Sequence, residues 1–186
     1  MACFCVFAGA ASGTHPNFET EVRDLATALS AQGHSFIYGG GATGLMGAFS
    51  DAVIDANGQI TGVIPHFLDE KEVGNTRLTT LTRTETMHER KAEMYAQADG
   101  FILLPGGLGS MDETMEVLTW LQLGLLKAPF YILNVNDYWQ PLQTLFDHII
   151  KNGFMHTRPL DYLCWAQTAG VLAALIADTE ERRKPA

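Results

Sequence analysis

The amino-acid sequence predicts an α/β fold, a Rossmann-like parallel β-sheet covered by helices on both faces. Short apolar runs rich in Val, Ile and Phe alternate with segments of helical spacing. These runs are almost continuously apolar, as is typical of strands buried on both faces of a parallel sheet. Glycine-rich turns follow three of the runs, where ligands of open α/β sheets bind. A length of 186 residues fits one domain, so we expect residues 1–186 to form a single domain.

Each expected element follows from its local pattern. Buried strands are expected at residues 3–8, 34–39, 60–65, 100–105 and 129–134, with a candidate short strand at 77–83. Helical spacing between them predicts helices at 17–32, 45–57, 86–98 and 111–126. Closing helices are expected at 138–151 and 168–178, followed by a solvated tail at 180–186.

Charge and hydropathy exclude several classes of protein. Twelve Lys and Arg against 21 Asp and Glu give a net charge of −9, which argues against nucleic acid as the main partner. The apolar N-terminus lacks the basic region of a signal peptide, because the first Arg or Lys is Arg23. No apolar stretch reaches the ~18 residues of a membrane span. We therefore expect a cytoplasmic protein without a membrane partner.

Three cysteines bear on redox and metal chemistry. Cys3 and Cys5 share one face of the first strand and could form half of a metal site, but no Cys/His cluster in the sequence completes it. Together with Cys164 they are expected to be free thiols, which suits a reducing compartment. No metal is expected.

A glycine-rich segment follows the second expected strand. Gly39-x-Gly41-x-x-Gly44 has the form of a dinucleotide fingerprint, but no acidic residue ends the next strand, so NAD is not indicated. Glycines let backbone amides approach an anion closely, and we expect Gly40 and Gly41 to contact a phosphate or ribose. The structural alternative is a tight turn with close helix–sheet packing.

A second glycine-rich segment, Pro105–Ser110, lies between a strand and a helix. Free N–H groups and the positive dipole at a helix N-terminus favour phosphate. No Gly-Lys-Ser/Thr follows, so the segment is not a Walker loop. The candidate phosphate ligands are Gly106, Gly107, Gly109 and Ser110.

Acidic residues crowd the same helix end. Ser110-Met-Asp-Glu113 fits a capping box, in which Glu113 only caps its own helix. Asp112 and Glu116 add negative charge there, so phosphate binding requires a cation between them and the anion.

The helix at 86–98 offers such a cation. Arg90 and Lys91 lie on the same stripe as the apolar Met87 and Met94. Because an unpaired buried charge is costly, both cations are expected to be paired, either in a structural ion pair with Glu113 or Glu116 or at a site. His88-Glu89 begins a zinc motif, but residue 92 is Ala, so the motif is incomplete.

Four motifs in order resemble the LONELY GUY family of cytokinin riboside 5′-monophosphate phosphoribohydrolases. They are Tyr38-Gly-Gly-Gly-Ala-Thr-Gly-Leu-Met-Gly47, Met87-His-Glu-Arg-Lys91, Pro105-Gly-Gly-Leu-Gly-Ser-Met-Asp-Glu113 and Leu118-Thr-Trp-Leu-Gln-Leu-Gly124. The similarity runs from about Cys5 to Ile176. Two motifs depart from the family pattern: Ser110 stands where the family has Thr, and Ala10 and Ala11 replace the two serines of the family's first loop, Gly-Ser-Ser-x-Gly.

This resemblance implies a Rossmann-like homodimer that hydrolyses the N-glycosidic bond of an adenine nucleotide without a cofactor. It places the family's catalytic Arg on Arg90 and its catalytic Glu on Glu113. The expected substrate-binding residues are Gly40, Gly41, Met87, Lys91, Gly106, Gly107, Gly109, Ser110 and Glu116. A homodimer also suits the helix at 111–126, which is apolar on nearly every side; burial inside the monomer is the alternative.

Two other functions fit parts of the sequence. A nucleotide-binding module without turnover could use the same loops. A pyridoxal-phosphate-dependent lysine decarboxylase needs a lysine that forms a Schiff base with the cofactor. The only candidates are Lys91 and Lys127, and no motif supports either.

Overall fold

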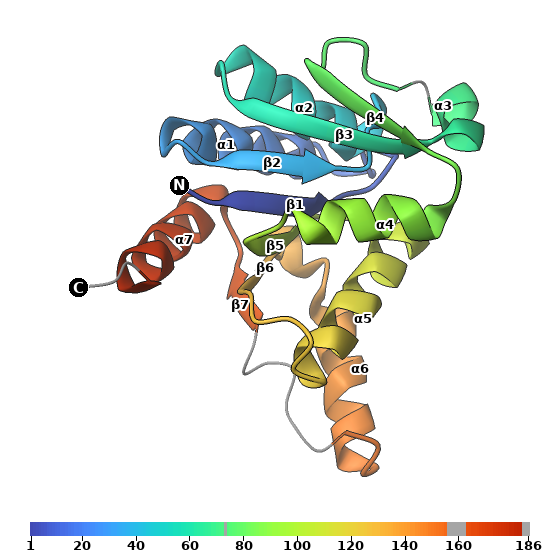
Figure 1. Ribbon diagram of the computed structural model, residues 1–186. Coiled ribbons are helices and arrows are strands. Elements are labelled where there is room, and N and C mark those ends of the chain that lie inside the picture. Colours follow the sequence, from blue (N-terminus) through green and yellow to red (C-terminus); the bar gives the residue numbers. More distant parts are fainter. Residues whose placement is uncertain (73, 156–162, 184–186) are drawn as a thin grey trace.

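The computed structural model describes residues 1–72, 74–155 and 163–183. Within these residues seven strands form one sheet in the order β4-β3-β2-β1-β5-β6-β7, and all neighbouring strands are parallel (Figure 1). This arrangement confirms the predicted α/β class. The strands are β1 (Cys3–Phe7), β2 (Ser35–Tyr38), β3 (Gln59–Pro65), β4 (Thr80–Thr84), β5 (Gly100–Leu103), β6 (Phe130–Leu133) and β7 (Leu163–Ala166).

Helices cover both faces of the sheet (Figure 1). One face is buried by α1 (Asn17–Ala31), α2 (Gly44–Asp55) and α7 (Ala169–Arg183), the other by α4 (Met87–Ala96), α5 (Leu108–Gln122) and α6 (Gln140–Lys151). The short helices α3 (His66–Glu72) and η1 (Val135–Asp137) follow β3 and β6. The run of β1 is continuously apolar because its side chains enter a core on each face of the sheet. Phe4 and Val6 enter the core beneath α1, α2 and α7, and Cys5 and Phe7 enter the core beneath α4, α5 and α6.

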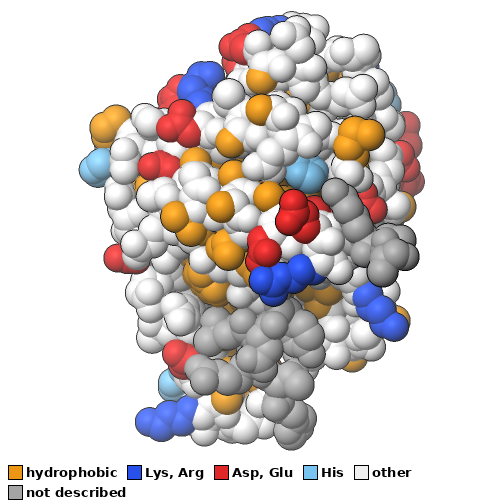
Figure 2. Space-filling model, turned by 90° about the vertical axis from the view of Figure 1, so that its left-hand side faces the viewer, with side chains coloured by type: hydrophobic (Ala, Val, Ile, Leu, Met, Phe, Trp, Pro, Cys, Tyr) orange, Lys and Arg blue, Asp and Glu red, His pale blue; other side chains and the backbone are white. Residues whose placement is uncertain are grey.

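The chain order creates a crevice beside β1. Its neighbours are β2 on one side and β5 on the other, so the connections after β1 and after β5 leave the sheet in opposite directions. In Figure 1 strands β1 to β4 point to the right, and the carboxyl end of β1 with this crevice lies on that side. Figure 2 shows the opposite side, where Lys and Arg side chains lie in separate small groups among acidic ones. The described side chains of that face form no continuous basic patch.

Several expected elements need correction. Strand β7 and helix α3 were not predicted. Helix α7 continues to Arg183, although an end at residue 178 and a solvated tail from 180 were expected. Ion pairs from Arg182 to Asp178 at 2.7 Å and from Arg183 to Glu180 at 3.3 Å support this last turn. The end of the expected tail, residues 184–186, lies outside the described residues.

The three cysteines are free thiols, as expected. Cys5 is fully buried between β2 and β5, and this burial raises its thiol pKa well above the ordinary value. Burial also raises the pKa of the half-buried Cys3 and Cys164. All three thiols are therefore held in the unreactive, protonated form.

Among the described helices, none has both the length and the apolar character needed to cross a bilayer.

Candidate active site

A cavity of about 500 Å³ opens where β1 and β5 end, at the crevice between the two directions of the fold. Its walls come from the loop after β1, the start of α2, the first turn of α4 and the segment from Pro105 to Glu113. Seven of the residues expected from the sequence line it: Met87, Arg90, Gly106, Gly107, Gly109, Ser110 and Glu113. Ala10 and Ala11, where the family has hydroxyl side chains, line it as well.

The two loops that flank the cavity touch backbone to backbone. The N–H of Gly9 donates to the carbonyl of Pro105 at 3.0 Å. A Cβ on Gly9 would lie 3.1 Å from Cα of Gly106, and a Cβ on Gly106 would overlap the hydroxyl of Ser110. Both positions therefore need glycine so that the strand ends can approach and the hydroxyl can be enclosed.

Helix α5 begins at Leu108, with Gly107 in the N-cap position, so its first N–H groups lie at the cavity wall without intrahelical acceptors. The capping box expected at Ser110 is wrong, because Ser110 already lies inside the helix and its carbonyl accepts a hydrogen bond from the Thr114 hydroxyl at 2.7 Å. A side-chain cap is instead present on α4, where the N–H of Glu89 donates to the Thr86 hydroxyl at 3.1 Å. Glu113 therefore forms no capping box with Ser110, and it lines the cavity.

Arg90 and Glu113 form an ion pair in the cavity wall. Nη1 of Arg90 lies 3.5 Å from Oε1 of Glu113, and each residue is only 7% exposed. Nε of Arg90 donates to the carbonyl of Val63 at 3.1 Å, which ties the guanidinium to the end of β3. The sequence predicted that Arg90 would be paired, and this ion pair confirms it. Because the pair is buried, water screens the attraction between its charges only weakly.

Lys91 and Glu116 lie apart from this pair and are not among the described residues that line the cavity. Nζ of Lys91 contacts Glu116 at 2.9 Å and Asp112 at 3.2 Å, and Tyr95 donates to Glu116 at 3.1 Å. Burial alone would lower the pKa of Lys91, but the two carboxylates outweigh it and raise that pKa. Lys91 therefore neutralises acidic charge at the start of α5 without facing the cavity.

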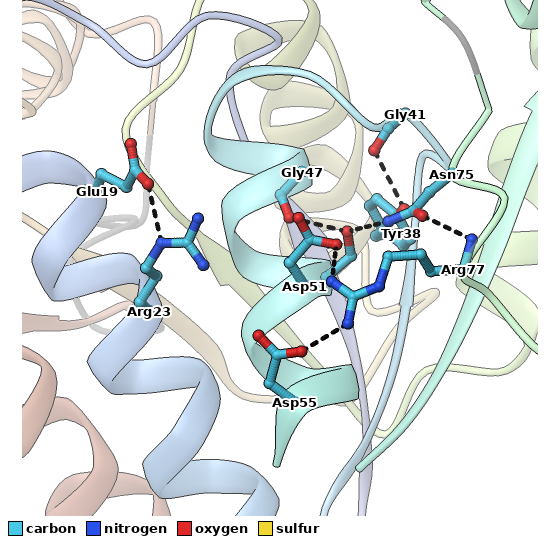
Figure 3. Close-up of polar contacts among 10 residues, drawn as sticks. Glu19, Arg23, Tyr38, Gly41, Gly47, Asp51, Asp55, Asn75 and Arg77 are labelled. Atoms are coloured by element: carbon cyan, nitrogen blue, oxygen red, sulfur yellow. Dashed lines mark hydrogen bonds and ion pairs between the residues drawn. The ribbon is translucent and has the colours of Figure 1, made fainter. Parts of the chain in front are cut away.

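Gly40 and Gly41 are likewise not among the described lining residues. The carbonyl of Gly40 accepts the Asn75 N–H at 2.9 Å, and that of Gly41 accepts the Tyr38 hydroxyl at 3.1 Å. Nδ2 of Asn75 also donates to the hydroxyl of Ser50 on α2 at 2.9 Å. Figure 3 shows Asn75 beside Tyr38 and Gly41. In this structure the tight-turn alternative describes these glycines, while Leu45 and Met46 of the same motif line the cavity.

Two aromatic lining residues were not found from the sequence. Phe18, at the start of α1, meets Tyr138 edge-on at 5.5 Å between ring centres. The Tyr138 hydroxyl donates to the carbonyl of Gly106 at 2.5 Å. The position of Tyr138 could have indicated a site residue, because Tyr138 follows the carboxyl end of β6, a strand next to β5.

The lining residues do not fit pyridoxal phosphate. A Schiff base requires a lysine in the cavity, and no lysine is among the described residues that line it. Lys127 is exposed in the connection after α5.

A parallel sheet, a glycine turn into a helix at the crevice and a buried Arg–carboxylate pair define a Rossmann-like α/β protein with a candidate hydrolase site. Residues 46–176 match the protein family described as "Possible lysine decarboxylase". The chain is 40% identical over 165 residues to the probable cytokinin riboside 5′-monophosphate phosphoribohydrolase LOGL3 of Oryza sativa subsp. japonica, covering 89% of this chain and 78% of that protein. Identity to the phosphoribohydrolase LOG2 of Arabidopsis thaliana is 37% over 174 residues, covering 94% and 82%. The chain belongs to this LONELY GUY family, which confirms the resemblance seen in its motifs.

Solved structures match the fold. A molybdenum cofactor binding protein from Rippkaea orientalis superposes with a TM-score of 0.71 at 18% identity, over 96% of both chains. The molybdenum cofactor carrier protein of Chlamydomonas reinhardtii gives a TM-score of 0.72 at 15% identity, over 98% of this chain and 99% of that one. At such identities the similarity concerns the fold alone.

Proposed function

We propose that this chain hydrolyses the N-glycosidic bond of adenine-type, cytokinin riboside 5′-monophosphates and releases free base and ribose 5-phosphate. The observation that carries the proposal is the buried Arg90–Glu113 pair in a cavity beside the N-terminus of α5. Relatives with about 40% identity that carry this activity in their names support it.

The chemistry of the bond assigns a role to Glu113. Cleavage of an N-glycoside passes through an oxocarbenium-like state with positive charge at the anomeric carbon. A fixed carboxylate stabilises that charge and can accept a proton from the attacking water. Arg90, held by Val63 and 3.5 Å from Glu113, orients the carboxylate. Burial keeps both groups in place before substrate arrives.

The 5′-phosphate belongs at Gly106–Ser110 in this proposal. Amides at the start of α5 and the positive helix dipole favour an anion there. Asp112 and Glu116 would oppose it, but the pairing of both with Lys91 reduces the repulsion. Binding energy from the phosphate positions the ribose against Glu113.

The base belongs against the apolar part of the cavity wall, to which Met87, Leu45 and Met46 contribute. Such contacts are non-directional, so changes on the base should be tolerated more readily than loss of the phosphate. The cavity volume of about 500 Å³ is in the range typical of small-molecule sites.

Product analysis tests the function. AMP and isopentenyladenosine monophosphate are incubated side by side with the protein, and base and ribose 5-phosphate are measured. We expect both products in equal amounts from at least one substrate. Tight binding of nucleotide without release of base would favour a nucleotide-binding module instead.

We further propose that residues 1–186 form one domain that works as a cytoplasmic homodimer. Helix α5 buries Val117, Leu118 and Leu121 within the monomer, but Leu123 and Leu125 directly after it are 65% and 68% exposed. Covering these side chains with a second copy removes apolar surface from water. Light scattering at micromolar concentration should give about twice 20.3 kDa. A particle of 20.3 kDa would contradict the dimer.

A further inference from the structure

The turn between β6 and α6 places the side chain of Tyr138 in contact with the glycine loop at Gly106. Tyr138 lines the cavity, and its hydroxyl donates to the carbonyl of Gly106 at 2.5 Å. Its ring stands edge-on to Phe18, another lining residue, and edge-on to Trp139 at 4.8 Å. Tyr138 is therefore held by packing on two sides, while its polar end reaches the loop proposed to bind phosphate.

The backbone before Tyr138 has an uncommon conformation. Asn136 and Asp137 both have positive φ, 51° and 55°, a region that residues with side chains seldom adopt and that Asn and Asp tolerate best. Gln167 donates to the carboxylate of Asp137 at 2.8 Å. Backbone in such a region persists where surrounding contacts fix it, and it is concentrated at functional sites.

Asn134 anchors the turn to the sheet. Its N–H donates to the carbonyl of Ala166 on β7 at 2.7 Å, and its side-chain oxygen accepts the N–H of Trp139 at 2.7 Å. Asn134 is buried, so these bonds are shielded from water. The sheet thus determines where Tyr138 stands.

The bond to Gly106 fixes more than one carbonyl. A trans peptide unit is planar, and its C=O and N–H point in opposite directions. Holding the Gly106 carbonyl therefore fixes the direction of the Gly107 N–H, which belongs to the same peptide unit at the N-cap of α5. Gly107 has no side chain that could hold this peptide unit, and a Cβ built on it would meet no atom within 4 Å.

We propose that Tyr138 is a positioning residue, whose hydroxyl sets the orientation of the Gly106–Gly107 peptide for binding the 5′-phosphate of the substrate. This inference rests on the proposed function, because it assumes that the loop holds a phosphate. Tyr138 acts through the loop on the phosphate half of the ligand, and it contributes nothing to the step at the anomeric carbon.

Tyr138→Phe tests the proposal, since it removes only the hydroxyl and keeps the ring packed on Phe18 and Trp139. A single neutral hydrogen bond of this kind corresponds to roughly a three- to tenfold change in binding. We expect KM for AMP and Kd for ribose 5-phosphate to rise by about that factor, with kcat changed less than about twofold. Binding of adenine, which has no phosphate, should not change.

Tyr131→Phe is the matched control. It removes a tyrosine hydroxyl from β6 in the core beneath α7, and Tyr131 is not among the described lining residues. KM, kcat and ribose 5-phosphate binding should stay at wild-type values in this variant. Equal losses for ribose 5-phosphate and adenine in Tyr138→Phe, a loss confined to kcat, or no change at all would overturn the positioning role.

The same measurements separate this proposal from the proposed function. A wild type that binds ribose 5-phosphate but releases no base from either nucleotide would refute the hydrolase, and the ratio of Kd values would still decide the role of Tyr138. A wild type that releases base from AMP but does not bind ribose 5-phosphate would overturn the role proposed for Tyr138 and leave the hydrolase proposal standing, whereas a wild type that does neither would overturn both.

Discussion

The guanidinium of Arg90 occupies the space in which a Cβ atom of residue 39 would lie. Gly39 directly follows β2, and the turn that it opens is held by Asn75, whose N–H donates to the carbonyl of Gly40. The hydroxyl of Tyr38 donates to the carbonyl of Gly41 in the same turn (Figure 3). The glycine turn of this motif thus acts on the cavity indirectly, by leaving room for the cation beside Glu113.

Gly39→Ala should therefore impair the site more than the fold. The flexible end of Arg90 must move away from the new methyl group, and with it the guanidinium partner of Glu113. A displacement of about 1 Å in a positioning group can cost on the order of 10²-fold in rate, so we expect kcat/KM for the nucleotide to fall by about that factor. Steady-state kinetics on AMP measure it.

Gly170→Ala is the control for that substitution, because nothing lies within 4 Å of a Cβ at this position in α7. Its kcat/KM should match the wild type. Equal activity of Gly39→Ala and the wild type would show that the position of the Arg90 guanidinium is irrelevant to turnover.

Glu113→Gln and Arg90→Ala should each remove most of the hydrolysis while the fold persists. The amide of Gln cannot accept a proton from water or stabilise a positive anomeric carbon as a carboxylate does. We expect kcat to fall by roughly 10²–10⁴-fold for Glu113→Gln, measured as release of free base. Glu93→Gln, on the exposed side of α4, should be unaffected. Turnover near the wild-type value in Glu113→Gln would reduce Glu113 to a structural residue.

Lys91→Met should lower stability with little effect on substrate binding. Lys91 is a buried partner of Glu116 and Asp112, and its loss leaves Tyr95 as the remaining partner described for Glu116. Because Asp112 is exposed and Glu116 is partly so, we expect a loss of roughly 1–3 kcal/mol in the free energy of unfolding. Urea denaturation measures this change.

Arg23→Met supplies the comparison, because it breaks an exposed i,i+4 pair with Glu19 and should cost less than about 1 kcal/mol. KM for AMP should stay within about twofold of the wild type in Lys91→Met. A raised KM with unchanged stability would instead support direct contact between Lys91 and the phosphate, as expected from the sequence.

His34 should make stability sensitive to mild acid. It is buried at the start of β2, where burial lowers its pKa and Nδ1 accepts the N–H of Ala2 at 3.3 Å. As pH falls below the ordinary histidine pKa of about 6.5, the unfolded chain binds a proton before the folded one does. The free energy of unfolding therefore decreases from that pH down to the lower pKa of the folded state.

Urea denaturation of the wild type and His34→Asn at pH 7.5 and pH 5.5 checks this dependence. Asn keeps a hydrogen-bond acceptor but does not titrate, so the difference between the two pH values should be smaller in the variant. The same difference in both proteins would assign the acid sensitivity to other groups.

The sequence was sufficient for the elements that contribute most to the core. Apolar runs predicted β1 and β5 with the glycine turns after them, because parallel buried strands have a clear composition. It missed β7, whose sequence Leu-Cys-Trp-Ala contains no Val, Ile or Phe, and α3, which has no repeating apolar pattern. The extra turn of α7 depends on ion pairs between charged residues, which a search for apolar spacing does not register.

The site was predicted as a set of residues but not as an arrangement. The stripe of α4 correctly placed Arg90 and Lys91 on the buried side. Which carboxylate pairs with Arg90 and which with Lys91 depends on where α5 begins. Its start at Leu108 could not be predicted, because Gly-Leu-Gly is a poor helix former. Tyr138 escaped notice because only the sheet order brings its turn beside Gly106.

The enzyme should require the 5′-phosphate. Amides at the start of α5, from Gly107 to Ser110, face an anion in the proposed complex, and adenosine would leave them without a partner in a partly dry cavity. Such unpaired groups cost about 1–3 kcal/mol each, so the loss of two or three implies a drop of roughly 10²–10⁵ in kcat/KM. The measurement is kcat/KM for AMP and for adenosine in one buffer, with free adenine as the common product. Similar values for the two substrates would show that the glycine loop does not bind the phosphate, because a site built around those amides cannot treat a charged and an uncharged ligand alike.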